Sequence, residues 1–201
     1  MRTTFLHLSD LHYRPEWPEQ IGLVFDKFIE DLKRELNHFE KPYLIFSGDL
    51  VREGEDPASY AAFHENIVAP LDQIGLTRDR RIVVPGNHDV SRMALKNKIG
   101  IIRGALSELS SEESFLNELP ALTSDLFKSK FDPYIEAEDK FAAMTCCHSH
   151  LGGAGWDLPG DIGVYCLNSA LCSFAGLNDP KTGEKIIDKE LLSIDTRTLY
   201  Q

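Results

Sequence analysis

The stretch VVPGNHDV, residues 83–90, decides the fold. Two valines, which are typical of buried strands, lead into Pro85, and Gly86 is then followed by an Asn, a His and an Asp. A buried strand that ends in amide, imidazole and carboxylate side chains holds these groups at the edge of a sheet. The stretch therefore predicts a rigid strand whose end carries part of a polar site.

The composition is typical of one folded domain. The chain has 201 residues, of which 42% are hydrophobic and 26% charged, enough for a full core. It contains no apolar run of about 18 residues, so no membrane partner is expected. The four cysteines lie close together without the spacing of a disulfide framework, which favours reduced thiols and a cytoplasmic location. The net charge of −11 disfavours a broad nucleic-acid surface.

Apolar patterns in the first half predict alternating strands and helices. Seven apolar residues at helical spacing indicate an amphipathic helix over 17–39. A second helix begins at Pro57, with Asp56 as its N-cap. The order strand, helix, strand, helix, strand predicts an α/β sheet with parallel neighbours. The expected elements are strands at 3–8, 43–47 and 81–85 and helices at 17–39 and 57–74.

The second half is predicted to continue the same domain, which we take to be residues 1–201. Residues 91–130 have a mostly helical pattern that a Ser- and Glu-rich segment interrupts, and another helix is expected from residue 186. Two further strands are expected at 140–147 and 163–170, joined by a Gly-rich loop at 150–163.

Polar residues follow each of the first three predicted strands. They are Asp10 and His12, then Asp49, and then Asn87 and His88. Consecutive parallel strands end at the same edge of a sheet, and ligands bind at that edge in α/β proteins. We therefore expect these five side chains to converge.

The residue types indicate metal chemistry. Carboxylate, imidazole and amide groups suit Mn²⁺, Fe, Zn²⁺ or Mg²⁺. One carboxylate can bridge two cations about 3.5–4 Å apart, and Asp49, in the middle of the three motifs, is the natural bridge. Two such cations lower the pKa of a shared water and hold phosphate oxygens during in-line attack. The strand ends therefore predict a site for two divalent metal ions.

The motifs D-x-H, G-D and G-N-H-D, in this order, resemble the calcineurin-like metallophosphoesterases. The resemblance implies a layered α/β sandwich of two mixed sheets flanked by helices. By matching positions, it implies that Asp10 and His12 hold one metal, Asn87 holds the other, and Asp49 bridges them. It further implies attack on phosphorus by a metal-bridging hydroxide. His88 would protonate the leaving oxygen or stabilise charge on the phosphoryl group.

The later histidine ligands of this family are missing. No G-H-x-H motif occurs, and the histidines beyond residue 88 are His148 and His150, which come before the last predicted strand. Because they lie two residues apart, they share one face of a strand and could replace the missing ligands, or they are loop residues. We therefore expect these 201 residues to be the N-terminal part of a longer chain, incomplete at the C-terminus of the fold.

A second departure is Arg52, since many relatives carry an acidic residue or His three positions after the G-D aspartate. An arginine cannot accept a hydrogen bond, but its guanidinium can hold a phosphate in a fork. We expect Arg52 to bind substrate. Two other expectations concern neighbours of the site: Asp89 caps a following helix, and Asn168 and Ser169, at the end of a strand, could line the site.

The expected activity is metal-dependent hydrolysis of a phosphodiester or phosphomonoester, with a nucleotide as the substrate. A DNA nuclease is an alternative, although the charge of −11 does not favour a nucleic-acid partner. A non-catalytic scaffold or regulatory module of a larger protein is the alternative from another class. The sequence leaves the substrate, the physiological metal and the oligomeric state open.

Overall fold

The computed structural model describes residues 3–16, 19–39, 42–91, 93–95, 128–142, 147–149, 153–170, 173 and 183. Its strands are β1 (Phe5–Leu8), β2 (Tyr43–Phe46), β3 (Arg81–Val83), β4 (Cys147–Ser149), β5 (Gly153–Leu158) and β6 (Ile162–Leu167). Its α-helices are α1 (Glu19–Glu35), α2 (Pro57–Phe63), α3 (Ala69–Gln73) and α6 (Lys128–Phe141), with shorter helical turns at Leu36–His38, His64–Val68, Arg78–Arg80 and Met93–Leu95. None of the helices in this part of the chain is long and apolar enough to cross a membrane.

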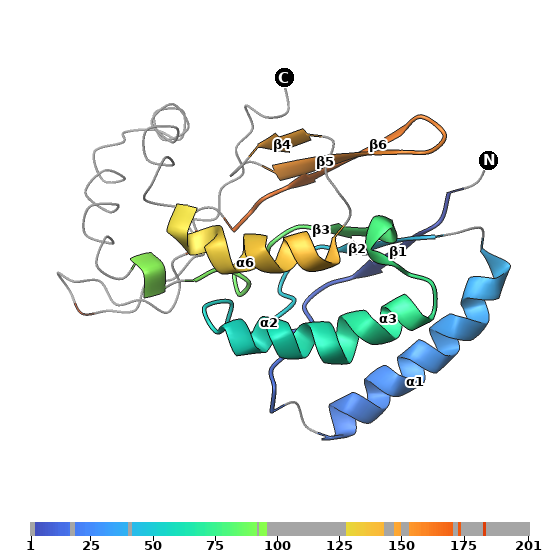
Figure 1. The fold of residues 1–201 in the computed structure, drawn as a ribbon, viewed down its shortest axis with the longest axis horizontal. Coiled ribbons are helices and arrows are strands. Elements are labelled where there is room, and N and C mark those ends of the chain that lie inside the picture. Colours follow the sequence, from blue (N-terminus) through green and yellow to red (C-terminus); the bar gives the residue numbers. More distant parts are fainter. Residues whose placement is uncertain are drawn as a thin grey trace.

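The first sheet is parallel, as predicted. Its order is β1-β2-β3, with Leu8 opposite Phe46 and Phe46 opposite Val83. The carboxyl ends of the three strands therefore lie at one edge (Figure 1). Both connections run through helices, as crossovers between parallel neighbours usually do.

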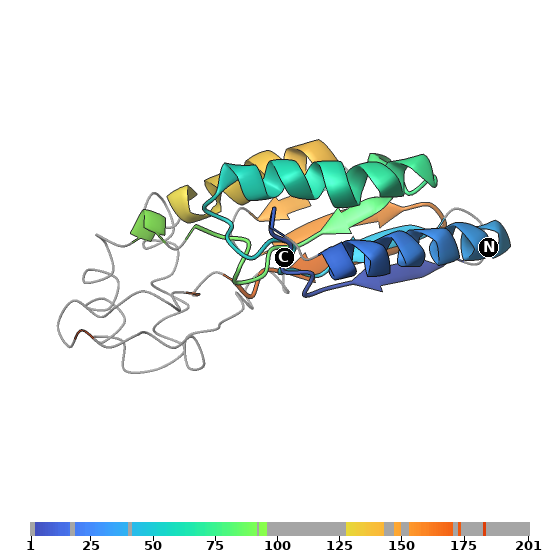
Figure 2. The same ribbon diagram turned by 90° about the horizontal axis from the view of Figure 1, so that it is seen from below.

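The helix between β2 and β3 begins as predicted. Asp56 is its N-cap and accepts a hydrogen bond from the backbone N of Ala58 at 3.0 Å, with Pro57 at the first position. A π-helical turn, His64–Val68, joins α2 to α3, so that the three segments run as one continuous helical rod. Figure 2 shows this rod beside α6.

Side chains alternate between the two faces of the first sheet, as the pleat of a strand requires. Leu44, Phe46 and Val83 are buried against the helices, in one core with side chains of α1, α2 and α6. Tyr43 and Ile82 lie on the opposite face, in a second core. The parallel sheet is therefore covered on both faces, which is usual for such sheets.

The second core joins the parallel sheet to an antiparallel one. This second sheet has the order β4-β5-β6. Ala154, Trp156 and Leu158 of β5 pack against Tyr43 and Ile82 of the first sheet. The layers are therefore helices, parallel sheet and antiparallel sheet, and the predicted α/β sandwich of two sheets with flanking helices is confirmed.

Two predictions about the second half were wrong. The predicted loop at 150–163 contains β5, whose Ala154, Trp156 and Leu158 have the period of two that marks a strand. Gly153 and Gly155, next to these residues, hid this pattern. A Cβ on Gly153 would overlap the carbonyl oxygen of Cys166 on β6, so the pairing requires glycine there.

The predicted strand at 140–147 is also different. Helix α6 continues to Phe141, and β4 begins only at Cys147. Tyr134, Ala137 and Phe141 place an apolar stripe at helical spacing on the core, which favours the helix. The helical predictions for most of 91–130 and for 186–194 lie outside the described residues.

Candidate functional site

The loops that follow β1 and β2 are joined by a ladder of backbone hydrogen bonds. The backbone N of Asp10 donates to the oxygen of Gly48 at 3.1 Å, and that of His12 donates to the oxygen of Asp49 at 2.8 Å. Tyr13 continues the ladder by donating to Leu50 at 2.9 Å. Two predicted ligand loops therefore lie side by side beyond the edge of the sheet.

Three of the predicted ligands have a left-handed backbone. The φ angles are 55° at Asp10, 45° at His12 and 54° at Asp49. This conformation costs a non-glycine residue about 1 kcal/mol, and it persists only where surrounding contacts enforce it. The backbone ladder supplies these contacts, so the chain maintains strained turns at the residues whose side chains share the site.

Close contact between the second and third loops requires two glycines. A Cβ on Gly48, which has φ of 105°, would lie 2.7 Å from the Cα of Gly86. A Cβ on Gly86 would overlap both the carboxylate and the backbone N of Asp49. The glycines of the G-D and G-N-H-D motifs therefore allow Asp49 and the third loop to meet.

Asp89 joins the second and third loops through hydrogen bonds to its buried carboxylate. Its carboxylate is fully buried and accepts hydrogen bonds from the backbone N of Val51 at 3.1 Å and of Gly86 at 2.8 Å. The hydroxyl of Tyr60 donates to its backbone oxygen. Burial raises the pKa of Asp89 to about 7, although the two N–H groups oppose the rise. The expected helix cap at Asp89 was wrong, because the carboxylate turns back to these loops instead.

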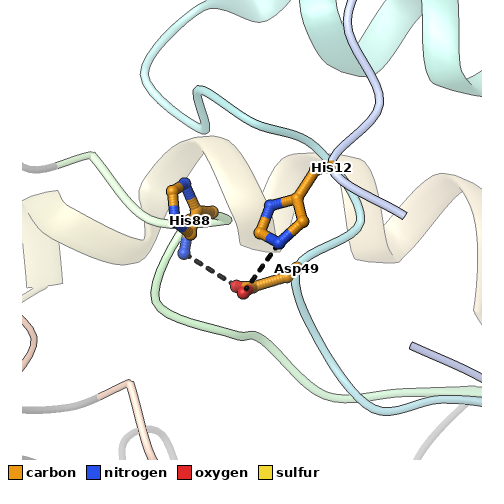
Figure 3. A group of neighbouring side chains, drawn as sticks. All are labelled: His12, Asp49 and His88. Carbon is orange, nitrogen blue, oxygen red and sulfur yellow. Dashed lines mark hydrogen bonds and ion pairs between the residues drawn. The ribbon is translucent and has the colours of Figure 1, made fainter. Parts of the chain in front are cut away.

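The side chains of His12, Asp49 and His88 form a group that could hold a metal ion (Figure 3). Their candidate ligand atoms lie within 4.8 Å of one another. Nε2 of His12 lies 3.7 Å from an oxygen of Asp49 and 3.9 Å from an oxygen of Asp10. These gaps are too long for hydrogen bonds. They are close to the separation of about 3–3.5 Å between two atoms that each lie about 2.1 Å from one shared ion. The donor set therefore fits a divalent cation.

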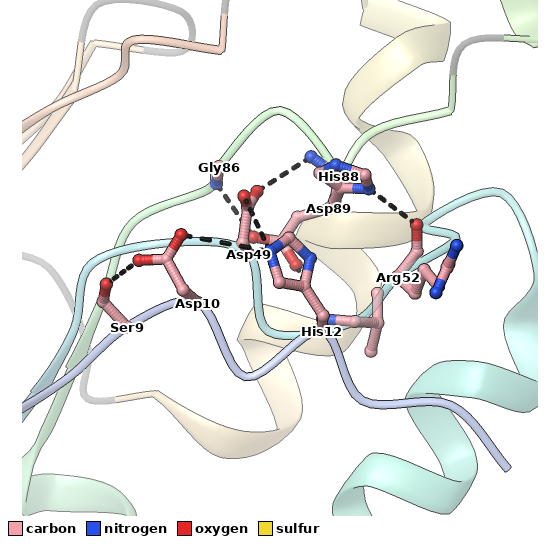
Figure 4. A network of polar contacts seen from close by, with 9 residues as sticks. Ser9, Asp10, His12, Asp49, Arg52, Gly86, His88 and Asp89 are labelled. Atoms are coloured by element: carbon pink, nitrogen blue, oxygen red, sulfur yellow. Dashed lines mark hydrogen bonds and ion pairs between the residues drawn. The ribbon is translucent and has the colours of Figure 1, made fainter. Parts of the chain in front are cut away.

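His88 is fixed at both its backbone and its ring. Its backbone N donates to Oδ1 of Asp49 at 2.9 Å, and its Nδ1 lies 3.0 Å from the carbonyl oxygen of Arg52 (Figure 4). A carbonyl oxygen only accepts, so Nδ1 carries the proton. Nε2 is then the ring nitrogen that can accept or deliver a proton. The ring packs edge-on against His12, with centroids 4.6 Å apart.

A small pocket opens between the ligand loops. Its volume is about 140 Å³. It is lined by Asp10, Ser47, Gly48, Asp49, Gly86, Asn87 and Ser169. Asn87 thus lies beside the two acidic residues. The side chain of Asp49 is only 13% exposed, whereas that of Asp10 is 72% exposed, so the predicted bridge is the more enclosed carboxylate.

The sequence did not indicate how Arg52 is used. Its backbone N donates to the oxygen of Tyr13 at 2.9 Å, and its carbonyl oxygen is the partner of His88. A main-chain carbonyl therefore holds the ring of His88, and this contact does not depend on the side chain at position 52. The guanidinium is exposed beside the site. His148 has its backbone in β4, but its side chain and the whole of His150 lie outside what the structure describes.

Comparisons with known proteins agree with the geometry. The sequence model of the calcineurin-like phosphoesterases matches residues 3–173. The chain is also 34% identical, over 99 residues, to an uncharacterized metallophosphoesterase-like protein of Bacillus subtilis, YydB. That match covers 46% of this chain and 18% of the length of the relative. No solved structure matches the chain.

Proposed function

The chain belongs to the calcineurin-like phosphoesterase family, and we propose that it is a hydrolase that cleaves a phosphodiester or phosphomonoester of a nucleotide with two divalent cations. The observation that carries this proposal is the convergence of three strand-end loops on Asp49. Carboxylate and amide side chains from the three loops line one small pocket, and the imidazoles of His12 and His88 lie beside Asp49.

The arrangement supports the metal ligands that the family motifs imply. Asp10 and His12 would hold one cation, Asn87 would hold the other, and Asp49 would bridge them. In support, Nε2 of His12 faces both carboxylates at 3.7 and 3.9 Å, and Asn87 lines the same pocket as Asp10 and Asp49. Bound divalent cations lower the pKa of a water molecule and neutralise phosphate oxygens.

His88 supplies the proton that the leaving oxygen needs. The Arg52 carbonyl keeps the proton on Nδ1 and turns Nε2 away from the backbone. In the imidazolium form, Nε2 carries a second proton that it can donate to the departing alkoxide. The positive charge of the same imidazolium also stabilises the negative charge of the phosphoryl group before the proton is transferred.

Arg52 binds the substrate through its guanidinium. Its backbone is fixed on both sides, by the N–H bond to Tyr13 and by the carbonyl bond to His88. The side chain therefore starts from a defined position next to the candidate acid. A guanidinium matches two phosphate oxygens in a fork.

A nucleotide is favoured over a nucleic acid by charge. The net charge of −11 would repel a long polyanion, whereas a small phosphate ester needs only the local field of the cations and Arg52. The pocket of about 140 Å³ suits one phosphoryl group with the rest of the molecule outside it.

Mn²⁺-dependent hydrolysis of bis-p-nitrophenyl phosphate tests the proposal, with Asp49→Asn as the matched variant. Asparagine keeps the shape of the side chain but removes the bridging charge, so we expect turnover to be abolished and Mn²⁺ affinity to fall. Equal activity in the two proteins would refute the dinuclear site. If the full natural chain binds Mn²⁺ but hydrolyses no substrate, the domain is a non-catalytic module.

A further inference from the structure

A buried lysine lies between two loops of the site. Lys130, in the first turn of α6, is 0% exposed. Its Nζ donates to the backbone oxygen of Ala170 at 2.7 Å and to that of Ser173 at 2.6 Å. An ammonium is rarely buried to this degree, because it loses its hydration, and it must be compensated by close acceptors. These carbonyls are such acceptors, so Lys130 holds the backbone at Ala170, next to Ser169, and at Ser173.

The backbone of the same residue holds another loop. The carbonyl oxygen of Lys130 accepts a hydrogen bond from the backbone N of Ser91 at 2.8 Å. Ser91 comes two residues after Asp89, at the end of the third ligand loop. Lys130 therefore contacts both the loop that carries Asn87 and His88 and the segment that follows β6.

The segment held by Lys130 reaches the pocket. Ser169 lines it together with Asp10, Asp49 and Asn87. The neighbours of Ser169 are fixed by local hydrogen bonds: Oδ1 of Asn168 accepts from the backbone N of Ala170 at 2.9 Å, and Ser173 N donates to the Ala170 oxygen at 3.1 Å. Ser169 itself is exposed and lines the pocket, so a ligand in the pocket can reach it.

We propose that Ser169 is a substrate-binding residue that donates a hydrogen bond to a phosphate oxygen, and that Lys130 is the positioning residue that holds it beside the ligand loops. The inference rests on the proposed function, since it names a further contact to the same substrate. A serine hydroxyl is both donor and acceptor, and it is the neutral donor that a negatively charged pocket tolerates before the cations bind. The ligand class is a phosphate monoester or diester, with inorganic phosphate as its simplest probe.

The test compares four variants of the full natural chain: Ser169→Ala, Lys130→Met, the double variant, and Lys140→Met as a control. Lys140 is on the same helix, but it is exposed and pairs with Glu136 at 3.0 Å. Substrate KM and the affinity of the Mn²⁺-loaded protein for inorganic phosphate are measured, together with amide exchange at Ala170 and Ser173.

We expect Ser169→Ala to raise KM and to weaken phosphate binding about tenfold with kcat nearly unchanged, as for loss of one hydrogen bond to a charged group. Lys130→Met should have the same effect and should speed amide exchange at Ala170 and Ser173. The double variant should be no worse than Ser169→Ala, because the two residues act as one unit. Lys140→Met should change nothing.

Two results would overturn the inference. One is unchanged KM and phosphate affinity in Ser169→Ala, which decides the matter even if Lys130→Met does not fold. The other is a double variant whose losses add, since Lys130 would then act independently of Ser169. These two results can be distinguished from failure of the proposed function, because in that case the unmodified protein would hydrolyse no substrate. Phosphate affinity and amide exchange can be measured without any hydrolysis.

Discussion

A partly buried carboxyl group on α6, that of Glu138, allows the packing of the helix against the sheets to be tested by pH. Glu138 lies near the two strand ends that adjoin the site, in a cavity bounded by Pro85, Tyr134 and Asn168. The hydroxyl of Tyr134 lies 3.4 Å from its Oε1. Burial raises the pKa of Glu138 from 4.5 to about 7, and the nearby Asp139 adds to the rise, while the contact with Tyr134 opposes it.

The sign of the effect follows from the raised pKa. Below about pH 4.5, Glu138 is protonated in both the folded and the unfolded state, so its contribution to stability is fully present. Between about pH 4.5 and 7, the unfolded chain loses this proton while the folded chain keeps it, and stability falls. A pKa that is about 2.5 higher in the folded state corresponds to a loss of about 3 kcal/mol by pH 8.

The variant Glu138→Gln removes this titration and keeps an acceptor for Tyr134. We expect its free energy of unfolding to exceed that of the unmodified protein by about 3 kcal/mol at pH 8, with the difference shrinking towards zero at pH 4.5. Urea denaturation at several pH values measures it. Glu136→Gln, on the exposed side of the same helix, is the control and should show little change at either pH. If the difference in free energy of unfolding between Glu138→Gln and the unmodified protein does not change with pH, the pKa of Glu138 is not raised by folding.

Other predictions concern the ligand loops. Gly86→Ala should lower the free energy of unfolding by about 1–3 kcal/mol and weaken Mn²⁺ binding, because the new methyl group overlaps Asp49. The control is Gly22→Ala, whose Cβ meets nothing within 4 Å and which should not weaken Mn²⁺ binding. Equal Mn²⁺ affinity in the two variants would contradict the close contact between Gly86 and Asp49. His88→Ala should slow turnover by about 10²–10⁴-fold with metal content retained in elemental analysis; loss of metal would identify His88 as a ligand. Arg52→Ala should raise KM about tenfold without altering the pH dependence of kcat, since the carbonyl that orients His88 remains, and an unchanged KM would exclude phosphate contact by the guanidinium.

The first half of the fold could be predicted because its signals are local. The apolar run before Pro85, the apolar stripe of α1 and the N-cap at Asp56 each predict the strand or helix in which they lie. Because the strands are parallel, their carboxyl ends then lie at one edge of the sheet. The second half gave weaker signals. In β5, Gly153 and Gly155 obscured a period-two pattern that Ala154, Trp156 and Leu158 display. The close approach of Cys166 on β6 requires the first of these glycines.

The parts of the site that the sequence did not reveal are contacts between distant segments. The carbonyl of Arg52 orients His88, yet a backbone atom has no sequence signature. Asp89 could not be distinguished from a helix cap, because its two partners lie on different loops. Lys130 looks like any surface lysine until the turn that it holds is known. Residue type and spacing predict which groups meet, whereas the positioning of those groups depends on tertiary structure.

Anomalous diffraction from crystals of the full natural chain grown with Mn²⁺ shows whether Asp49 bridges two cations. We expect a peak about 2.0–2.3 Å from both Asp49 and Nε2 of His12, with a second peak on the Asn87 side of the same carboxylate. A single peak beside Asp49 would retain the metal site but contradict the bridging role. Mn²⁺ bound elsewhere, with no ion on Asp49, would contradict both the metal site and the function proposed from it.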